Sequence, residues 1–401
     1  MKQQKYIIAS LWSAGSQYIF FALNFLGQIA LARLLLPEHF GVMALVLSIQ
    51  GLLEIALSFS VPMAYMHFKE TDTLFSSALT LSFVNWLLLM VITSLSLYPI
   101  YYFYQEEVAL FIFLITIFRW FSSISSIYIA RLEKNLDFKT ATLITGIATI
   151  VAIVFAVSAA FMGANEYSLL TRELIAPLLI FVIAKFYINI PLNFFNFDRD
   201  EVQQLFKYSF KMFFSRGTSV LYQRLPFVFI GTYYTANTLG FVSQIFYLSM
   251  LYDRLMASFT QKIAFLFYSH STANSKESKK GFFYINGFIL IAGIPVFILF
   301  FFFPEWLLYT LWGEKWLDGA IYLKMMAPFA LLYPMYENIK SYFYGHAENE
   351  KITYANIVGI LSYFTIIFFN SDSYMLSLSF SISLLVMMIF TLPYLWKRLR
   401  V

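Results

Sequence analysis

Long apolar stretches recur from one end of this chain to the other, and they limit its fold more than any other feature. A helix needs about 20 mostly apolar residues to cross a bilayer. Charged residues make up only 12% of the chain, against about 25% in a soluble globular protein. The sequence therefore predicts an all-α integral membrane protein. About twelve transmembrane helices are expected, at residues 8–35, 40–62, 75–98, 108–130, 139–162, 167–190, 205–232, 237–262, 281–303, 317–345, 352–369 and 374–396.

The basic residues of the loops give the predicted orientation. Loops on the cytoplasmic side of membrane proteins carry an excess of Lys and Arg. With the N-terminus inside, the opposite side receives only Arg33 and Lys315. We therefore expect a multi-pass protein with both termini in the cytoplasm. The inner side receives Lys2, Lys5, Lys69, Arg131, Lys134, Lys139, Lys185, Arg199, Lys207, Lys262, Lys276, Lys279, Lys280, Lys351, Lys397, Arg398 and Arg400.

Short loop motifs repeat at a spacing of about half the chain, as in transporters built from two similar halves. The alternative reading is chance similarity between short loops. A true repeat predicts two six-helix bundles, 1–195 and 196–401, related by a pseudo-two-fold axis along the membrane normal, with a cavity between them. The matched pairs are Leu36–Val42 with Thr235–Phe241, Tyr104–Val108 with Trp312–Trp316, and Lys134–Gly146 with Glu348–Gly359.

The stretch Lys207–Gly231 is apolar enough to span the bilayer, yet it contains Arg216 and Arg224. At helical spacing, Arg216 shares a stripe with Ser209, Ser219 and Gln223, and Arg224 lies at the edge of that stripe. A charge near the bilayer centre costs roughly 3 kcal/mol or more when it faces lipid. The stripe therefore faces protein or water, and two arginines about 12 Å apart along the helix axis are suited to bind an anion.

Other predicted spans carry polar residues on one face as well. Together they predict a cationic substrate cavity formed by Arg216, Arg224, Arg254, Arg119, Lys340 and Lys324. The predicted polar lining of that cavity consists of Gln17, Asn24, Gln28, Gln50, Ser219 and Gln223. The candidates for ion coupling are Glu54, Asp253 and Glu337.

Several alternatives stay open at this point. Glu337 and Lys340, at i and i+3, either pair with each other or face the cavity. Arg172, Lys211 and Lys324 lie near helix ends, from which long side chains can snorkel to the interface. Polar uncharged residues often only join packed membrane helices by hydrogen bonds. Arg119, Arg216, Arg224 and Arg254 outnumber the nearby carboxylates within their predicted spans, which favours an anion-facing role.

Several function classes find no support in the sequence. The chain has no cysteine, so disulfides and thiolate metal sites are excluded. It has no GxxxxGK[ST] loop that would bind ATP. The four histidines, His39, His67, His270 and His346, lack the spacing of a metal site. No long extramembrane loop could hold catalytic carboxylates. We therefore expect no enzyme activity, no catalytic or metal-binding residues, no cofactor and no nucleic-acid partner.

Four stretches resemble a known family, and together they run across most of the chain. They are Leu31–Ala64 (LARLLLPEHFGVMALVLSIQGLLEIALSFSVPMA), Arg131–Phe138 (RLEKNLDF), Phe229–Ser269 with IGTYYTANTLGF, and Leu311–Leu317 (LWGEKWL). They resemble the polysaccharide-biosynthesis transporters, the Wzx-type flippases of the multidrug/oligosaccharidyl-lipid/polysaccharide (MOP) exporter superfamily.

The resemblance implies two six-helix bundles with a central cavity that opens alternately to each side of a bacterial cytoplasmic (inner) membrane. The implied substrate is an undecaprenyl-diphosphate-linked oligosaccharide, which moves from the inner to the outer leaflet for O-antigen, capsule or exopolysaccharide synthesis. Membrane lipid, a polysaccharide polymerase and a chain-length regulator are candidate partners. The alternatives are a drug/cation antiporter of the same superfamily and, ranked last, a membrane polymerase or ligase. The oligosaccharide and the energy source stay open.

Overall fold

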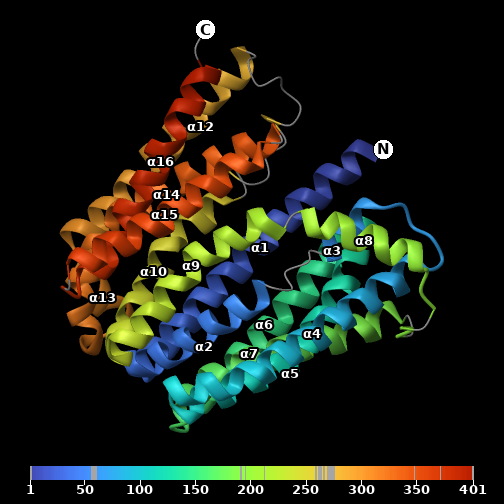
Figure 1. Ribbon diagram of the computed structural model, residues 1–401, viewed down its shortest axis with the longest axis horizontal. Helices are drawn as coiled ribbons and strands as arrows, with labels where there is room; N and C mark the ends of the chain where they lie inside the picture. The colour runs from blue at the N-terminus through green and yellow to red at the C-terminus, as the bar shows by residue number, and fades with distance from the viewer. Residues whose placement is uncertain are drawn as a thin grey trace. The chain divides into compact units, whose positions relative to one another are not determined.

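The structure is a computed structural model, and Figure 1 shows its helices. It describes residues 2–55, 61–189, 192–194, 196–211, 213–257, 260, 264, 267–268, 276–346, 348–370 and 372–399; the side chains of 2–17, 211, 213–216, 276–277 and 399 lie outside that description. All regular elements in these ranges are helices. In lipid a helix satisfies its own backbone hydrogen bonds, so this is the expected result for apolar spans. The predicted all-α membrane fold is confirmed.

The chain divides into two compact units, Met1–Gly217 and Thr218–Val401. The predicted lobes, 1–195 and 196–401, stay a prediction. The first unit contains α1 (Lys2–Leu34), α2 (Pro37–Ile55), α3 (Val61–His67), α4 (Leu74–Phe103), α5 (Glu106–Lys134), α6 (Phe138–Phe161), α7 (Glu166–Ile188) and α8 (Arg199–Lys211). The later elements are α9 (Phe213–Tyr233), α10 (Ala236–Ala257), α12 (Lys276–Phe302), α13 (Pro304–Trp312), the 3-10 helix η2 (Glu314–Gly319), α14 (Ala320–Gly345), α15 (Asn349–Phe369) and α16 (Met375–Leu399).

Most of the predicted spans overlap with one long helix. Among the described residues, seven of these helices are long and apolar enough to cross a membrane: α2, α4, α5, α6, α12, α15 and α16. Tyr18–Leu34 of α1 forms a shorter apolar helix. Other predicted spans coincide with helices that carry more polar side chains, such as α14 with Lys324, Glu337 and Lys340.

The prediction of a single helix over residues 205–232 was wrong in its first part. The structure places two helices there, α8 and α9, so Ser209 lies on α8 and not on the helix of Arg216 and Arg224. The physical reason is the sequence of α8, RDEVQQLFKYSFK, in which polar side chains alternate with apolar ones at helical spacing. Such a helix is amphipathic and does not cross a bilayer.

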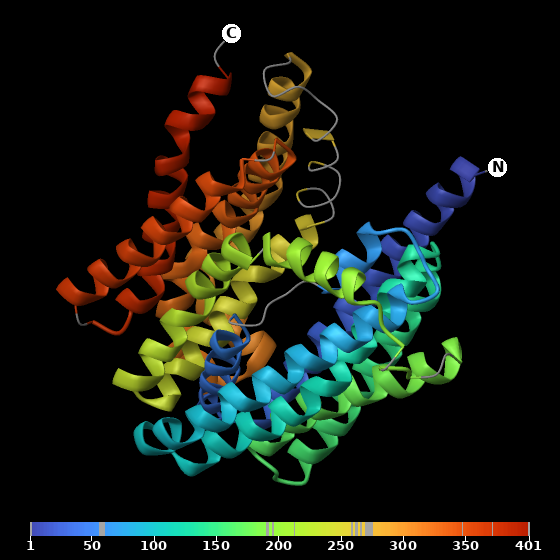
Figure 2. The ribbon, with the colours of Figure 1, turned by 45° about the vertical axis from the view of Figure 1, so that its right-hand side comes forward.

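Close helix packing builds each unit. In the first unit α5 packs against α4 and α7, and α6 packs against α7 and α1, as Figure 2 shows. Gly27 and Gly146 allow α1 and α6 to approach: a Cβ atom would lie 2.3 Å from Ile153 at Gly27 and 2.1 Å from the Phe20 ring at Gly146. Small residues allow such approach between membrane helices. In the second unit, α14 packs against α10, α12 and α16, and α15 packs against α16.

Candidate functional site

A charged pair lies inside the membrane-spanning part of the first unit. Nε of Arg119 on α5 is 2.6 Å from Oε1 of Glu54 on α2, and the two side chains are 34% and 33% exposed. The amide of Gln50, which is completely buried, donates a hydrogen bond of 3.2 Å to the same Glu54 oxygen. The sequence pattern did not pair Arg119 with Glu54, because the two residues lie on different helices.

Two further predicted lining residues are held by a cation on α7. Arg172 donates through Nη1 to Oε1 of Gln28 at 3.0 Å and through Nη2 to Oδ1 of Asn24 at 3.2 Å. The guanidinium therefore joins α7 to α1 and satisfies both amide oxygens. Arg172 turns towards α1, which the sequence left open.

In the second unit, hydrogen bonds connect α9 to α14 and α15. Gln223 donates to the hydroxyl of Tyr333 at 3.2 Å, and Nδ2 of Asn356 donates to the hydroxyl of Ser219 at 3.0 Å. The hydroxyl of Tyr336 donates to Oδ1 of Asn356 at 3.1 Å. Asn356 is a residue that sequence reasoning missed. Its signal in the sequence was the only side-chain amide in the predicted span 352–369, and the structure buries it.

The carboxylates of the second unit lie close to a buried lysine. Nζ of Lys340 is 2.7 Å from Oε1 of Glu337, and the two side chains are only 12% and 8% exposed. Of the two alternatives for this pair, the structure shows pairing. Asp253 on α10 is also buried, and its Oδ1 atom has no hydrogen-bond partner among the described residues.

The remaining predicted cations lie in different surroundings. Arg254 is exposed, with its guanidinium carbon 4.6 Å from the centre of the Tyr247 ring. Lys324 is half-buried, with Nζ 5.2 Å from the centre of the Phe301 ring. Both contacts are cation–π interactions. Arg224 is half-buried. The side chains of Gln17 and Arg216 lie outside the described residues.

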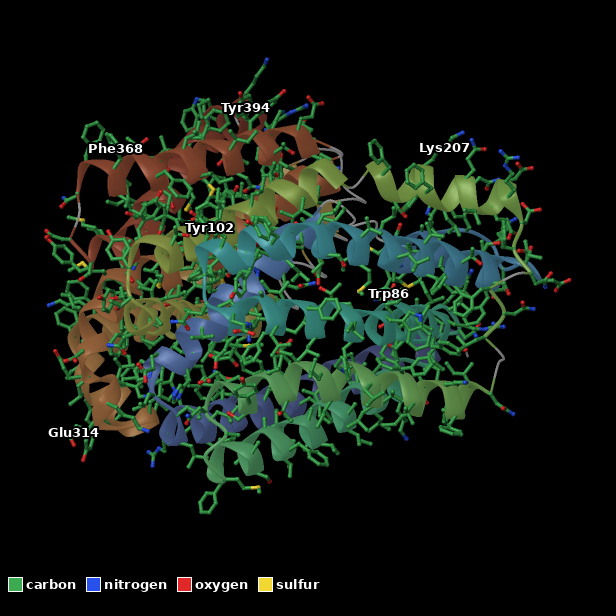
Figure 3. The ribbon with its side chains drawn as sticks, turned by 60° about the horizontal axis from the view of Figure 1, so that its bottom comes forward. Trp86, Tyr102, Lys207, Glu314, Phe368 and Tyr394 are labelled. Carbon is green, nitrogen blue, oxygen red and sulfur yellow. The ribbon has the colours of Figure 1, made fainter. Side chains whose placement is uncertain are left out.

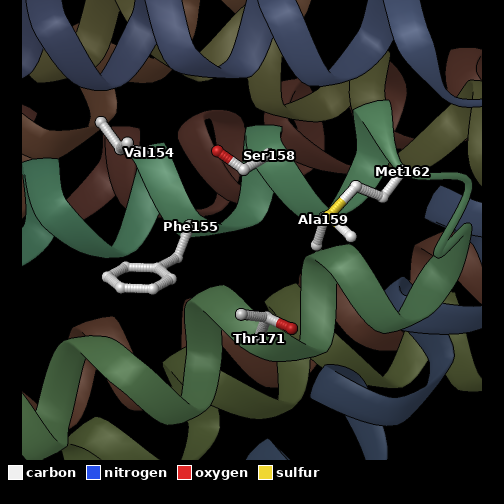
Figure 4. Close-up of a pocket in the computed structure, with 6 residues that line it drawn as sticks. All are labelled: Val154, Phe155, Ser158, Ala159, Met162 and Thr171. Atoms are coloured by element: carbon white, nitrogen blue, oxygen red, sulfur yellow. The ribbon is translucent and has the colours of Figure 1, made fainter.

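Figure 4 shows a pocket between α6 and α7 of the first unit that does not fit an anion. It contains none of the predicted site residues. Its lining is mostly apolar: Val154, Phe155, Ser158, Ala159, Met162 and Thr171. Val154, Phe155 and Met162 are more than half exposed, as expected of side chains that face lipid.

The sequence profile of the family described as "Polysaccharide biosynthesis protein" matches residues 30–321. This chain belongs to that family. No curated protein is significantly similar to it in sequence. The expected membership in a polysaccharide-biosynthesis family is confirmed.

Solved structures with the same fold are transporters of the MOP superfamily. An inward-facing multidrug-resistance MATE family transporter has a TM-score of 0.72 at 13% identity, covering 97% of this chain and 98% of its own. An outward-facing MATE family transporter gives a TM-score of 0.60 at 14% identity, covering 98% and 95%. A MOP superfamily transporter from Pyrococcus furiosus, reported to have a binding pocket of reverse polarity, gives a TM-score of 0.58 at 15% identity. This match covers 98% of the present chain and 94% of the other. The polysaccharide biosynthesis protein therefore has the MOP transporter fold.

The two units of this polysaccharide biosynthesis protein differ in how they hold charge. In the first, Glu54 and Arg119 neutralise each other while remaining one-third exposed. In the second, Glu337, Lys340 and Asp253 are withdrawn from the surface. The Glu54–Arg119 pair is therefore accessible at the surface of its unit, whereas Glu337, Lys340 and Asp253 are buried.

Proposed function

We propose that this polysaccharide biosynthesis protein is a flippase for undecaprenyl-diphosphate-linked oligosaccharide. The headgroup moves from the inner to the outer leaflet of the bacterial cytoplasmic membrane by alternating access, and both termini are cytoplasmic. The six-helix lobes move against each other while the polyprenyl tail stays in lipid. The product is used in surface polysaccharide synthesis, by a polymerase and a chain-length regulator.

The observation that carries this proposal is the partly exposed side chain of Arg119 within a membrane-spanning helix. A charge at this depth is too costly to face lipid, so one-third exposure indicates contact with water or ligand. Guanidinium offers paired donors that match the oxygens of a phosphate. Arg224, Arg254, Lys324 and Arg216 are the further cations of the proposed diphosphate site. Polar side chains such as Asn24 and Ser219 contact the sugars in this proposal.

The proposal assigns ion coupling to Asp253 and Glu337 in the second unit. Both are buried carboxylates, and one Lys340 ammonium lies beside Glu337. A proton or a small cation would remove the excess negative charge of this group. This assignment is independent of the anion site, so it can fail without affecting it.

Export measurements in cells test the function. In a strain lacking the gene, the wild-type protein restores surface polysaccharide, and R119Q and R254Q each restore at least about tenfold less, as expected for the loss of a charged contact. K280Q, which removes an exposed lysine on α12, is the matched control and restores the wild-type amount.

Wild-type export by both R119Q and R254Q would contradict the proposed site. A drug/cation antiporter makes the opposite prediction for the whole protein. It would leave surface polysaccharide unchanged when the gene is deleted and would protect cells from toxic organic cations.

A further inference from the structure

The carboxylate of Glu54 occupies the position at which a bound anion would contact Arg119. This carboxylate contacts Nε of the guanidinium at 2.6 Å. Within the part of the chain that the structure describes, Glu54 is the only ion-pair partner of Arg119. The guanidinium therefore meets Glu54 through Nε, while one-third of the Arg119 side chain is exposed.

Buried polar groups hold Glu54 in this position. Thr116 on α5 donates to Oε1 of Gln50 at 3.1 Å, and Gln50 in turn donates to Glu54. Thr116, Gln50 and Thr93, which lies 3.3 Å from Thr116, are completely buried. The carboxylate is thus anchored from the protein side by a fixed donor, while one-third of its side chain stays exposed. Glu54 keeps this amide donor when it loses the guanidinium.

We infer that Glu54 is an exchangeable counter-ion that holds Arg119 in the absence of substrate and is displaced by a phosphate group of the substrate. This inference rests on the proposed function. A diphosphate carries more charge and more acceptor oxygens than a carboxylate, so it competes for the same donors. The return of Glu54 to Arg119 assists release of the diphosphate after the headgroup has crossed. The Glu54–Arg119 pair thereby limits the affinity of the site for the diphosphate, so that the substrate can dissociate.

Binding of inorganic pyrophosphate to the purified full chain in detergent micelles tests the exchange. Calorimetry on E54Q gives a dissociation constant about tenfold lower than the wild-type value, because an ionised competitor within contact distance has been removed. R119Q binds pyrophosphate at least about tenfold more weakly, and E54Q/R119Q binds as weakly as R119Q. E54D, which keeps the charge, binds as the wild type does. E305Q, at an exposed glutamate of α13, is the control for removal of one negative charge.

Unchanged or weaker binding by E54Q, with folding verified by thermal unfolding, would overturn the exchange. The exchange would also be overturned if E305Q strengthened pyrophosphate binding as much as E54Q does. Flipping by the wild-type protein is measured separately in proteoliposomes. If wild-type flipping is present and E54Q fails to bind more tightly, the exchange is wrong and the flippase stands. Tighter binding by E54Q without wild-type flipping upholds the exchange and contradicts the flippase.

A second inference comes from α8, which has three distinct sides. Leu205 and Ser209 are completely buried, and Lys207 is exposed, as Figure 3 shows for this helix at the edge of the first unit. Between these two sides lie Phe206 and Phe210, which are 41% and 44% exposed. Their rings stack with centroids 5.9 Å apart. An aromatic side next to a basic side is the pattern of a helix that lies in a membrane interface.

Contacts with the other helices of the first unit fix α8 at the end of a membrane span. Glu201 accepts a hydrogen bond of 2.8 Å from Ser77, which lies in the first turn of the spanning helix α4. Tyr208 stacks on His67 at the end of α3, with centroids 4.4 Å apart. The chain enters the next long helix, α9, just after α8. These contacts hold the helix at the depth where α4 leaves the membrane.

We propose that α8 lies in the plane of the membrane surface, with Phe206 and Phe210 at the boundary between headgroups and acyl chains. The partner is the lipid itself. Lys207 points to the headgroups and favours anionic lipid. The attachment of α8 to α4 and to the lipid keeps the start of α9 near the membrane surface.

The absence of cysteine makes this placement testable by spin labelling without removing native residues. Single labels at F206C, F210C and Q204C are compared in the full chain in vesicles of phosphatidylcholine and phosphatidylglycerol. Gln204 is the matched control, because it is exposed on the polar side of the same helix. We expect oxygen to raise the relaxation rate most for the labels at 206 and 210. We expect a water-soluble nickel complex to raise it most for the label at 204. Equal access of the nickel complex to all three labels would overturn the proposal.

Discussion

Nζ of Lys340 lies 2.7 Å from Oε1 of Glu337, less than one turn earlier on α14, in surroundings where neither side chain is more than 12% exposed. The pair holds a positive and a negative charge within the second unit, in which the carboxylate of Asp253 on α10 is also buried. A buried ion pair contributes little net stability when intact, but the loss of one partner leaves an uncompensated charge.

We therefore expect K340M to destabilise the protein by about 3–5 kcal/mol, since it leaves Glu337 without its cation. The double variant E337Q/K340M removes both charges and is expected to regain a large part of that loss. Thermal unfolding of the purified proteins in the same detergent measures both effects. An unfolding temperature of K340M equal to that of the wild type would show that the pair does not stabilise the second unit.

The close approach of α1 and α6 predicts a second effect on stability. A Cβ atom at Gly146 would lie 2.1 Å from the Phe20 ring, so the ring or the helix must move. We expect G146A to cost about 1–3 kcal/mol, the usual cost of overpacking. Gly287, where a Cβ would have no heavy atom within 4 Å, is the control. G287A is expected to be neutral or slightly stabilising, because Ala favours a helix more than Gly does. Equal unfolding temperatures for the two variants would count against the packing of α1 on α6.

The connection between α14 and α15 predicts a dependence of stability on pH. Burial opposes ionisation of Glu348, but hydrogen bonds and ion pairs with Lys351 and with Arg398 at 2.5 Å outweigh it and hold the pKa of this carboxyl below its ordinary value of 4.5. A pKa that is lower in the folded state gives stability that is present above the unfolded pKa and lost as the pH falls through the folded pKa. We expect the wild type to lose this contribution below about pH 4.5.

The control for this dependence is E348Q, which cannot titrate at residue 348. Its stability at neutral pH is expected to be lower than that of the wild type, and the difference is expected to shrink as the pH falls. Denaturation at a series of pH values measures both curves. Parallel curves over the whole range would mean that ionised Glu348 does not stabilise the fold.

The spans could be predicted from the sequence because each apolar run of about 20 residues has to form its own backbone hydrogen bonds in lipid. The division between α8 and α9 could not, because Leu205, Phe206 and Tyr208 continue the apolar pattern of the next span. The pairing of Glu337 with Lys340 was one of two predictable outcomes, since i and i+3 are neighbours on a helix.

The sequence pattern could not predict which side chains pair between different helices. Glu54 and Arg119 lie on α2 and α5, and the rotation of each helix about its axis depends on packing that a single sequence does not specify. The same holds for Arg172 and its two amide partners on α1. The types of the site residues were therefore predictable, but their partners were not.

The central claim is that this protein carries a diphosphate-linked headgroup across the membrane and that Arg119 takes part. The most direct measurement reconstitutes the purified protein in liposomes that contain an undecaprenyl-diphosphate-linked oligosaccharide with a fluorescent sugar. A membrane-impermeant quencher then reports the fraction of headgroups in the outer leaflet over time. We predict rapid loss of the protected fraction with the wild-type protein, wild-type rates with K280Q, and rates reduced at least about tenfold with R119Q. A protected fraction that decays no faster with the wild type than in protein-free liposomes would contradict the claim.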